Sequence, residues 1–190
     1  LQGRGESVMV SCQAVMALQE VAEILQKNKI FPQQVAKYTE AAQVMRSNIL
    51  HYARNDRGWF NSVFNDDGKW IFSNQDPDGQ SRPYGPSNYY AVISRTVEPE
   101  RVHEVLAVAD MLKGHCGYRL FYPPLGGQKI PHVGRQTTGD VPPFLAENGN
   151  VYNHGSQGFL ARALGKAGQG DRLFDVLQWM LPYDQQRHPT

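Results

Sequence analysis

The chain has 190 residues, a formal net charge of +1 at pH 7 and 41% apolar residues. This length and apolar content suit one folded domain with a sizeable core and argue against intrinsic disorder. The balanced charge offers no basic surface for nucleic acid, and no membrane span is expected because no apolar run approaches ~18 residues. Cys12 and Cys116 are the only cysteines; free thiols are favoured over a disulfide, which indicates a cytoplasmic protein.

The first two elements are predicted to be a helix pair. Residues 7–28 are apolar around most of the circumference of a helix, which is typical of an interior helix. Residues 32–54 carry one apolar stripe at spacings of three and four, with Pro32 in the first turn. The second helix is therefore expected to lie outside the first.

A hairpin and a long loop are predicted next. Aromatic and polar residues alternate over residues 59–72 around Asp66-Asp67-Gly68, which is a hairpin turn signal. The two acids lack the alternating ligand spacing of a calcium loop, and the histidines lack zinc-site spacing, so no metal site is expected. Residues 74–86 are rich in Asp, Gly, Pro and Asn and are predicted to be loop.

Two further helix pairs are predicted. They cover residues 87–95 and 99–114, with Pro99 at a first helical position, and residues 154–167 and 171–181, with Asp171 as the N-cap of the last helix. Residues 117–135 are predicted to be extended and residues 136–149 to be loop. The pattern alone predicts a mostly α protein of paired helices with elaborate loops.

Five segments carry a family resemblance. Glu147, Asn148, Gly149, Tyr152 and His154 follow the spacing E-N-G-G-x-[FY]-x-H, and Gly168-Gln169-Gly170-Asp171-Arg172 follows G-x-G-D-R. This run resembles the C-terminal part of the catalytic domain of the inverting disaccharide and oligosaccharide phosphorylases. Cellobiose, chitobiose and β-1,2-oligoglucan phosphorylases and the phosphorylase-like domain of cyclic β-1,2-glucan synthase share it. Residues 3–8 (GRGESV), 57–73, 87–106 and 117–127 resemble further family segments in the same order.

The resemblance implies a fold and a position within it. Residues 1–190 are expected to be a single partial domain, truncated at both ends, that forms half of an (α/α)6 barrel of paired antiparallel helices with a β-hairpin and long loops. The family's general acid is the Asp of a W-N-D motif, which is expected before Leu1. No catalytic residue is therefore assigned within the chain, and this piece alone is expected to be inactive.

A phosphate site is predicted at His154, Gly155 and Ser156. Unpaired N–H groups at a helix start bind anions, and a histidine adds a donor that gains charge near neutral pH. The resemblance assigns His154 to the attacking phosphate. From the residues alone, a histidine that caps its own helix or hydrogen-bonds a carbonyl is the alternative.

A sugar site is predicted from residues in two regions. The resemblance places Glu147, with Asn148 beside it, among sugar hydroxyls, and places Arg4 and Glu6 in the segment that lines the sugar site. Gln157 lies one helical step further in and is predicted to belong to the sugar site as a supporting group. The alternatives are a solvated loop acid for Glu147 and ordinary capping of the first helix by Glu6 or Ser7.

The implied reaction is inverting phosphorolysis of a β-linked di- or oligosaccharide to an α-sugar 1-phosphate. The partners are then the saccharide and phosphate, with inorganic phosphate as co-substrate, no metal or organic cofactor, and a possible homodimer. The alternatives are a glycoside hydrolase or transglycosylase of the same fold, or a non-catalytic toroid that binds glycans.

Overall fold

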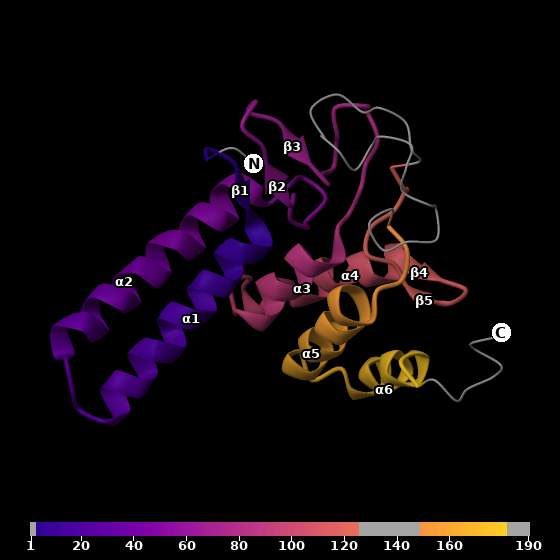
Figure 1. Cartoon of the computed structure of the whole chain (residues 1–190). Helices are drawn as coiled ribbons and strands as arrows, with labels where there is room; N and C mark the ends of the chain where they lie inside the picture. Colours follow the sequence, from indigo (N-terminus) through magenta and orange to yellow (C-terminus); the bar gives the residue numbers. More distant parts are fainter. Residues whose placement is uncertain (1–2, 126–148, 182–190) are drawn as a thin grey trace.

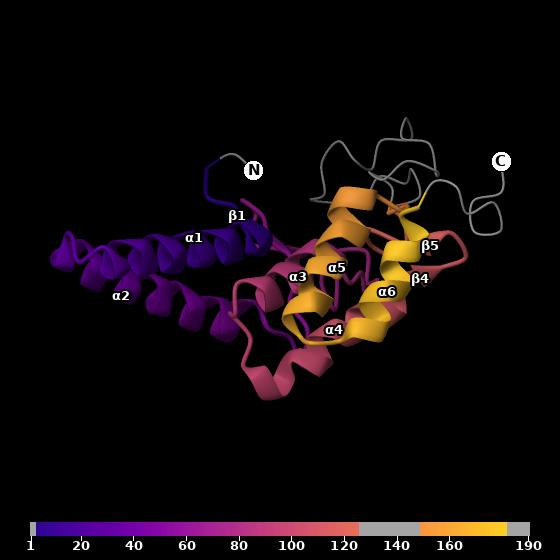
Figure 2. The ribbon, with the colours of Figure 1, turned by 90° about the horizontal axis from the view of Figure 1, so that it is seen from below.

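The computed structural model describes residues 3–125 and 149–181 (Figure 1). This part of the chain is mostly helical with short antiparallel strands, as the sequence predicts. The helices are α1 (Val8–Lys27), α2 (Pro32–Asn48), α3 (Gly85–Ile93), α4 (Val102–Leu112), α5 (Phe159–Lys166) and α6 (Gly170–Trp179). Helix α3 packs against α1, α4 and α5, and so lies at the centre of the helical layer (Figures 1 and 2).

Helices α1 and α2 form the long pair that extends away from the other helices in Figure 1. Pro32 begins α2, as predicted. The prediction that α1 is interior is confirmed on one face only, where Cys12 and Val15 are fully buried. Other apolar side chains are exposed, and most of them lie in the second half: Val10 54%, Val21 43% and Ile24 58%. The far end of α1 lies beside α2 and away from α3, which is short and lies near the start of α1 (Figures 1 and 2).

By length and composition α1 could also cross a membrane, contrary to the expectation from the sequence that no run is apolar enough. Its only carboxylates are Glu20 and Glu23, and the apolar residues around them keep the helix as a whole apolar. A core helix passes the same test, and here α1 packs on α2 and α3.

The predicted hairpin is confirmed and gains a third strand. Strands β2 (Val63–Phe64) and β3 (Trp70–Ile71) pair antiparallel, and β1 (Glu6–Ser7) pairs with β2 in the register Glu6↔Phe64. The Val8 amide at the start of α1 donates to the Ser62 carbonyl oxygen at 2.8 Å, and no side chain caps the helix. The hairpin, rather than capping by Glu6 or Ser7, therefore fixes where α1 begins.

The main core lies between α1, α3, α4 and α5. Tyr89, Leu106 and Leu160 are among its fully buried members. Cys12 and Cys116 are both free thiols, as predicted, and burial raises the pKa of Cys12 to about 11.

The start of α6 corrects one prediction. Helix α5 ends before Gly168, whose φ of +69° suits the left-handed residue that closes a helix. Only one residue remains before α6 begins at Gly170, so Gln169 is the N-cap and the prediction of Asp171 is wrong. Asp171 lies in the first turn instead, where its charge complements the helix dipole.

Candidate functional site

His154 lies in a π-helical turn, Asn153–Gly158, that runs directly into α5. The amides of Ser156 and Gln157 both donate to the Tyr152 carbonyl oxygen, at 2.7 and 3.3 Å. The amides that precede Ser156 therefore have no acceptor within the turn, which is the arrangement that favours an anion. Single π turns in front of an α-helix are frequent at functional sites.

The imidazole of His154 is on the surface. It contacts the ring of Tyr152 edge-on, with the ring centroids 6.1 Å apart. The N-cap of the turn is Tyr152 with no side-chain cap, so His154 does not cap its own helix. Its side chain is accessible from solvent, and phosphate binding by His154 stays a prediction.

The buried Ser156 side chain hydrogen-bonds to the backbone at the start of the turn. Its hydroxyl accepts a hydrogen bond from the Tyr152 amide at 2.8 Å and donates one to the Tyr152 carbonyl oxygen. The residue is fully buried. Phosphate binding by Ser156 stays a prediction, but its hydroxyl and its amide already bond to Tyr152.

Gly155 is the residue that brings the turn close to its neighbours. A Cβ at this position would lie 2.6 Å from Cδ1 of Tyr152 and 3.2 Å from Cδ1 of Leu120. Any larger residue would displace the Tyr152 ring from beside His154. This close approach explains a glycine at position 155, and phosphate binding by Gly155 stays a prediction.

Gln157 is fully buried, so the prediction that it binds sugar finds no support in this geometry. Its Oε1 accepts a hydrogen bond from the Tyr118 amide at 3.3 Å, and its Nε2 donates to Oδ1 of Asn153 at 2.7 Å. Tyr118 belongs to β5 (Gly117–Tyr118), which pairs with β4 (Lys113–Gly114). The amide therefore ties the turn to the end of α4.

The segment after β5 forms one wall beside the turn. The Leu120 amide donates to the Asn150 carbonyl oxygen at 2.9 Å, and the Gly85 amide donates to the Leu120 carbonyl oxygen at 2.9 Å. The ring of Phe121 packs on that of Phe72, with centroids 4.7 Å apart. The loop before α3, the segment after β5 and the approach to His154 are thus held together.

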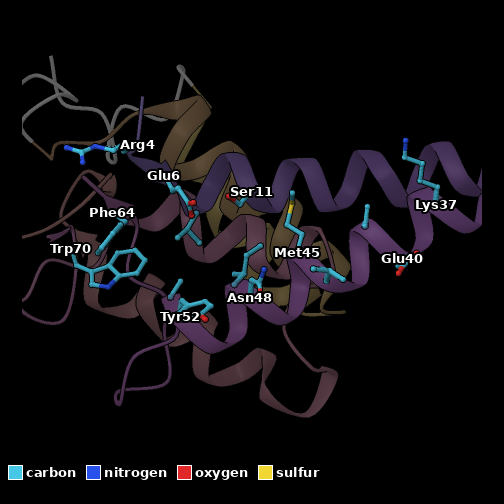
Figure 3. Close-up of a pocket in the computed structure, with 15 residues that line it drawn as sticks. Arg4, Glu6, Ser11, Lys37, Glu40, Met45, Asn48, Tyr52, Phe64 and Trp70 are labelled. Carbon is cyan, nitrogen blue, oxygen red and sulfur yellow. The ribbon is translucent and has the colours of Figure 1, made fainter. Parts of the chain in front are cut away.

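Arg4 and Glu6 lie elsewhere, along a groove of about 1010 Å³ between α1, α2 and the hairpin. Trp70 and Phe64 lie at one end of this groove and Lys37 at the other (Figure 3). His154 does not line it, so the structure does not bring these two predicted sugar residues to the His154 turn.

Asp66 lies in the predicted hairpin turn and hydrogen-bonds to the segment before β1. The Asp66 carboxylate accepts hydrogen bonds from the Arg4 and Gly5 amides at 2.8 and 3.1 Å, which suits a turn rather than a metal site. Within residues 3–125 and 149–181, no cluster of three or more His, Cys, Asp or Glu is placed to hold a metal. Glu147 and Asn148 lie outside the described residues.

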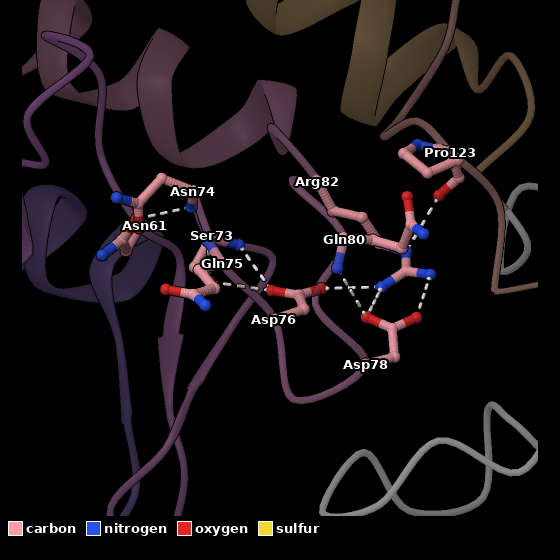
Figure 4. A network of polar contacts seen from close by, with 9 residues as sticks. All are labelled: Asn61, Ser73, Asn74, Gln75, Asp76, Asp78, Gln80, Arg82 and Pro123. Atoms are coloured by element: carbon pink, nitrogen blue, oxygen red, sulfur yellow. Dashed lines mark hydrogen bonds and ion pairs between the residues drawn. The ribbon is translucent and has the colours of Figure 1, made fainter.

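A buried polar network, which the sequence did not predict, supports the same wall. Arg82 is 3% exposed and donates to Asp76 Oδ2 at 3.1 Å, to both oxygens of Asp78, and to the Pro123 carbonyl oxygen at 3.1 Å (Figure 4). Asp76 also accepts bonds from the amide and hydroxyl of Ser73, both at 2.8 Å. Burial raises the pKa of Asp76, whereas hydrogen bonding from Arg82 lowers the pKa of Asp78. The sequence analysis missed this network because a segment rich in Asp, Gly and Pro indicates turns but does not indicate whether its side chains are buried.

The chain belongs to the glycosyl hydrolase 94 superfamily, whose catalytic-domain model matches residues 1–189. It is 32% identical over 181 residues to solabiose phosphorylase from Paenibacillus borealis, covering 95% of this chain and 23% of that protein. It is 27% identical over 189 residues to the 3-O-beta-D-glucopyranosyl-beta-D-glucuronide phosphorylase of the same organism, covering 98% of this chain and 23% of that protein. The predicted resemblance to the phosphorylases is confirmed, and the chain spans about a quarter of the length of these relatives.

Proposed function

We propose that the protein containing this chain catalyses inverting phosphorolysis of a β-linked di- or oligosaccharide to an α-sugar 1-phosphate. Membership of the glycosyl hydrolase 94 superfamily, with two relatives that are both named phosphorylases, carries this proposal. The exposed His154 in front of α5 adds a physical reason, because a helix start beside a histidine donor suits a phosphate dianion.

The chemistry needs one carboxylic acid and a positioned phosphate. A phosphate oxygen attacks C1 from the face opposite the leaving group while the acid protonates the glycosidic oxygen, so one C–O bond forms as the other breaks. Phosphate thus replaces the base-activated water of an inverting hydrolase. The acid is expected N-terminal to Leu1, and no metal or organic cofactor is expected.

Positioning and charge neutralisation then carry most of the catalysis. His154 would donate to the phosphate, beside the amides of the turn that precede Ser156. Glu147 and Asn148 would pair with sugar hydroxyls.

We also propose that residues 1–190 are a partial domain that forms half of an (α/α)6 barrel. Three consecutive helix pairs, α1/α2, α3/α4 and α5/α6, pack in sequence order. Apolar side chains are exposed at both ends of this row: Val44 is 55% exposed on α2, and Phe174 is 64% and Leu177 43% exposed on α6. Further helix pairs of the longer protein would cover these side chains.

The remaining expectations concern the cellular location of the protein and its binding partners. The free thiols of Cys12 and Cys116 fit a reducing compartment and support the cytoplasmic location that the sequence predicts. A homodimer, and the absence of nucleic-acid and membrane partners, stay predictions.

The proposal is tested on the full-length protein with His154→Ala. Wild-type protein is incubated with β-linked disaccharides and a series of phosphate concentrations, and sugar 1-phosphate is measured. We expect the variant to raise the KM for phosphate by at least about tenfold, because a charge-assisted hydrogen bond is worth roughly 1.5–3 kcal/mol. Equal release of reducing sugar with and without phosphate would replace the proposal by the hydrolase alternative.

A further inference from the structure

A buried amide connects the His154 turn to strand β5. Gln157 is fully buried, and its side chain spans from the Tyr118 amide (3.3 Å) to Oδ1 of Asn153 (2.7 Å). Asn153 is the first residue of the turn and is adjacent to His154. Both ends of the Gln157 amide are therefore used, one as acceptor and one as donor.

Gly117 provides the space for this amide. It has a φ of +116°, and a Cβ at this position would lie 2.2 Å from Oε1 of Gln157. That separation is far inside van der Waals contact, and the backbone conformation itself favours glycine. The glycine in β5 therefore leaves the space that the buried Gln157 amide occupies.

The strand that receives the amide is itself fixed. The Tyr118 hydroxyl donates to Oδ2 of Asp175 on α6 at 3.2 Å, and Lys113 donates to the same oxygen at 3.1 Å. Gln157 therefore holds Asn153 in place relative to β4, β5 and α6. The Ser156 hydroxyl bonds to Tyr152, which precedes Asn153 in the chain.

We propose that Gln157 is a positioning residue for phosphate: by holding Asn153 against β5, it sets the place of the His154 backbone and imidazole in the anion site. This inference rests on the proposed function. Gln157 does not touch phosphate itself, because its side chain is fully buried. Its effect is expected in phosphate binding, since a misplacement of about 1 Å at a reacting group can cost up to about 10²-fold.

The test compares Gln157→Leu with Asn88→Leu in the full-length protein. Asn88 is a matched control, because it is also a fully buried amide, bonded to the Phe60 amide at 2.8 Å, but makes no bond to the His154 turn. We expect Gln157→Leu to raise the KM for phosphate about tenfold and leave the KM for saccharide within twofold. Asn88→Leu should lower the folded fraction, and hence the apparent kcat, without changing the KM for phosphate.

Two further variants keep the test decisive if Gln157→Leu does not fold. Gln157→Glu keeps the size and the acceptor for Tyr118 but loses the donor to Asn153, and Gly117→Ala drives the amide out of place from the other side. Each should raise the KM for phosphate selectively. An unchanged KM for phosphate in these variants overturns the inference alone, whereas a wild-type protein with no phosphate dependence overturns the proposed function and this inference together.

Discussion

Replacing Arg82 by Met should loosen the wall beside the His154 turn. Arg82 is 3% exposed and is the cation that faces Asp76, which is 2% exposed. Without it the Asp76 carboxylate stays buried without a compensating charge, which typically costs about 3–5 kcal/mol. Asp78 can regain water because 23% of its side chain is exposed, so most of the cost arises at Asp76. The Pro123 carbonyl oxygen also loses its donor.

Hydrogen exchange read by mass spectrometry on the full-length protein measures this cost locally. Peptides that cover residues 73–82 and 118–125 should lose roughly 10²–10³-fold in protection, as expected for about 3–4 kcal/mol of local stability. Arg101→Met is the matched control, because Arg101 is 48% exposed and its solvent-screened pair with Glu104 should contribute little to stability. Adding Asp76→Asn to Arg82→Met should restore part of the protection, since the uncompensated charge is then gone.

Two results would contradict the role of the network formed by Arg82, Asp76 and Asp78. If Arg82→Met left exchange in both peptides within twofold of wild type, the pair would not hold the two loops together. If the double variant exchanged faster than Arg82→Met alone, the cost would not arise from the stranded Asp76 charge.

Three other predictions follow from single contacts. Because hydrogen bonding from Arg82 lowers the pKa of Asp78, its stabilisation is present above the unfolded pKa of about 3.9 and is lost as the pH falls through the folded pKa; the difference in unfolding midpoint between wild type and Asp78→Asn should therefore be present at pH 6 and shrink as the pH falls below about 3.9. Gly149→Ala should lower the melting temperature and the activity, because Gly149 has a φ of +85° and the new Cβ would lie 2.6 Å from a facing backbone carbonyl oxygen; a melting temperature equal to wild type would contradict this. Phe174→Glu should reduce the yield of folded full-length protein if further helices cover this 64% exposed ring, whereas Lys166→Glu on the exposed end of α5 should not; equal yields would contradict the barrel proposal.

The long helix pair and the hairpin were predictable because their signals are local. The Pro32 helix start and the Asp66-Asp67-Gly68 turn each depend on residues within a few positions of each other. Strand β1 was not predicted, because two residues carry no period and its partner lies far away in sequence. The exposed second half of α1 was missed because composition does not tell which faces find a neighbour.

The sequence motif predicted which residues belong to the candidate site, but it did not predict how those residues are arranged. The E-N-G spacing located His154, but the π turn and the burial of Gln157 depend on contacts with β5. The position of Arg4 and Glu6 in another groove was equally hidden, since closeness in a family motif does not fix distance in the fold.

Phosphate dependence with inversion of configuration is the central claim. The most direct measurement follows the full-length protein and a β-linked disaccharide by ¹H and ³¹P nuclear magnetic resonance, with and without inorganic phosphate. The proposed mechanism predicts an α-sugar 1-phosphate as the first product and no cleavage in the absence of phosphate. A β-sugar 1-phosphate, or free sugar formed at the same rate without phosphate, would contradict it.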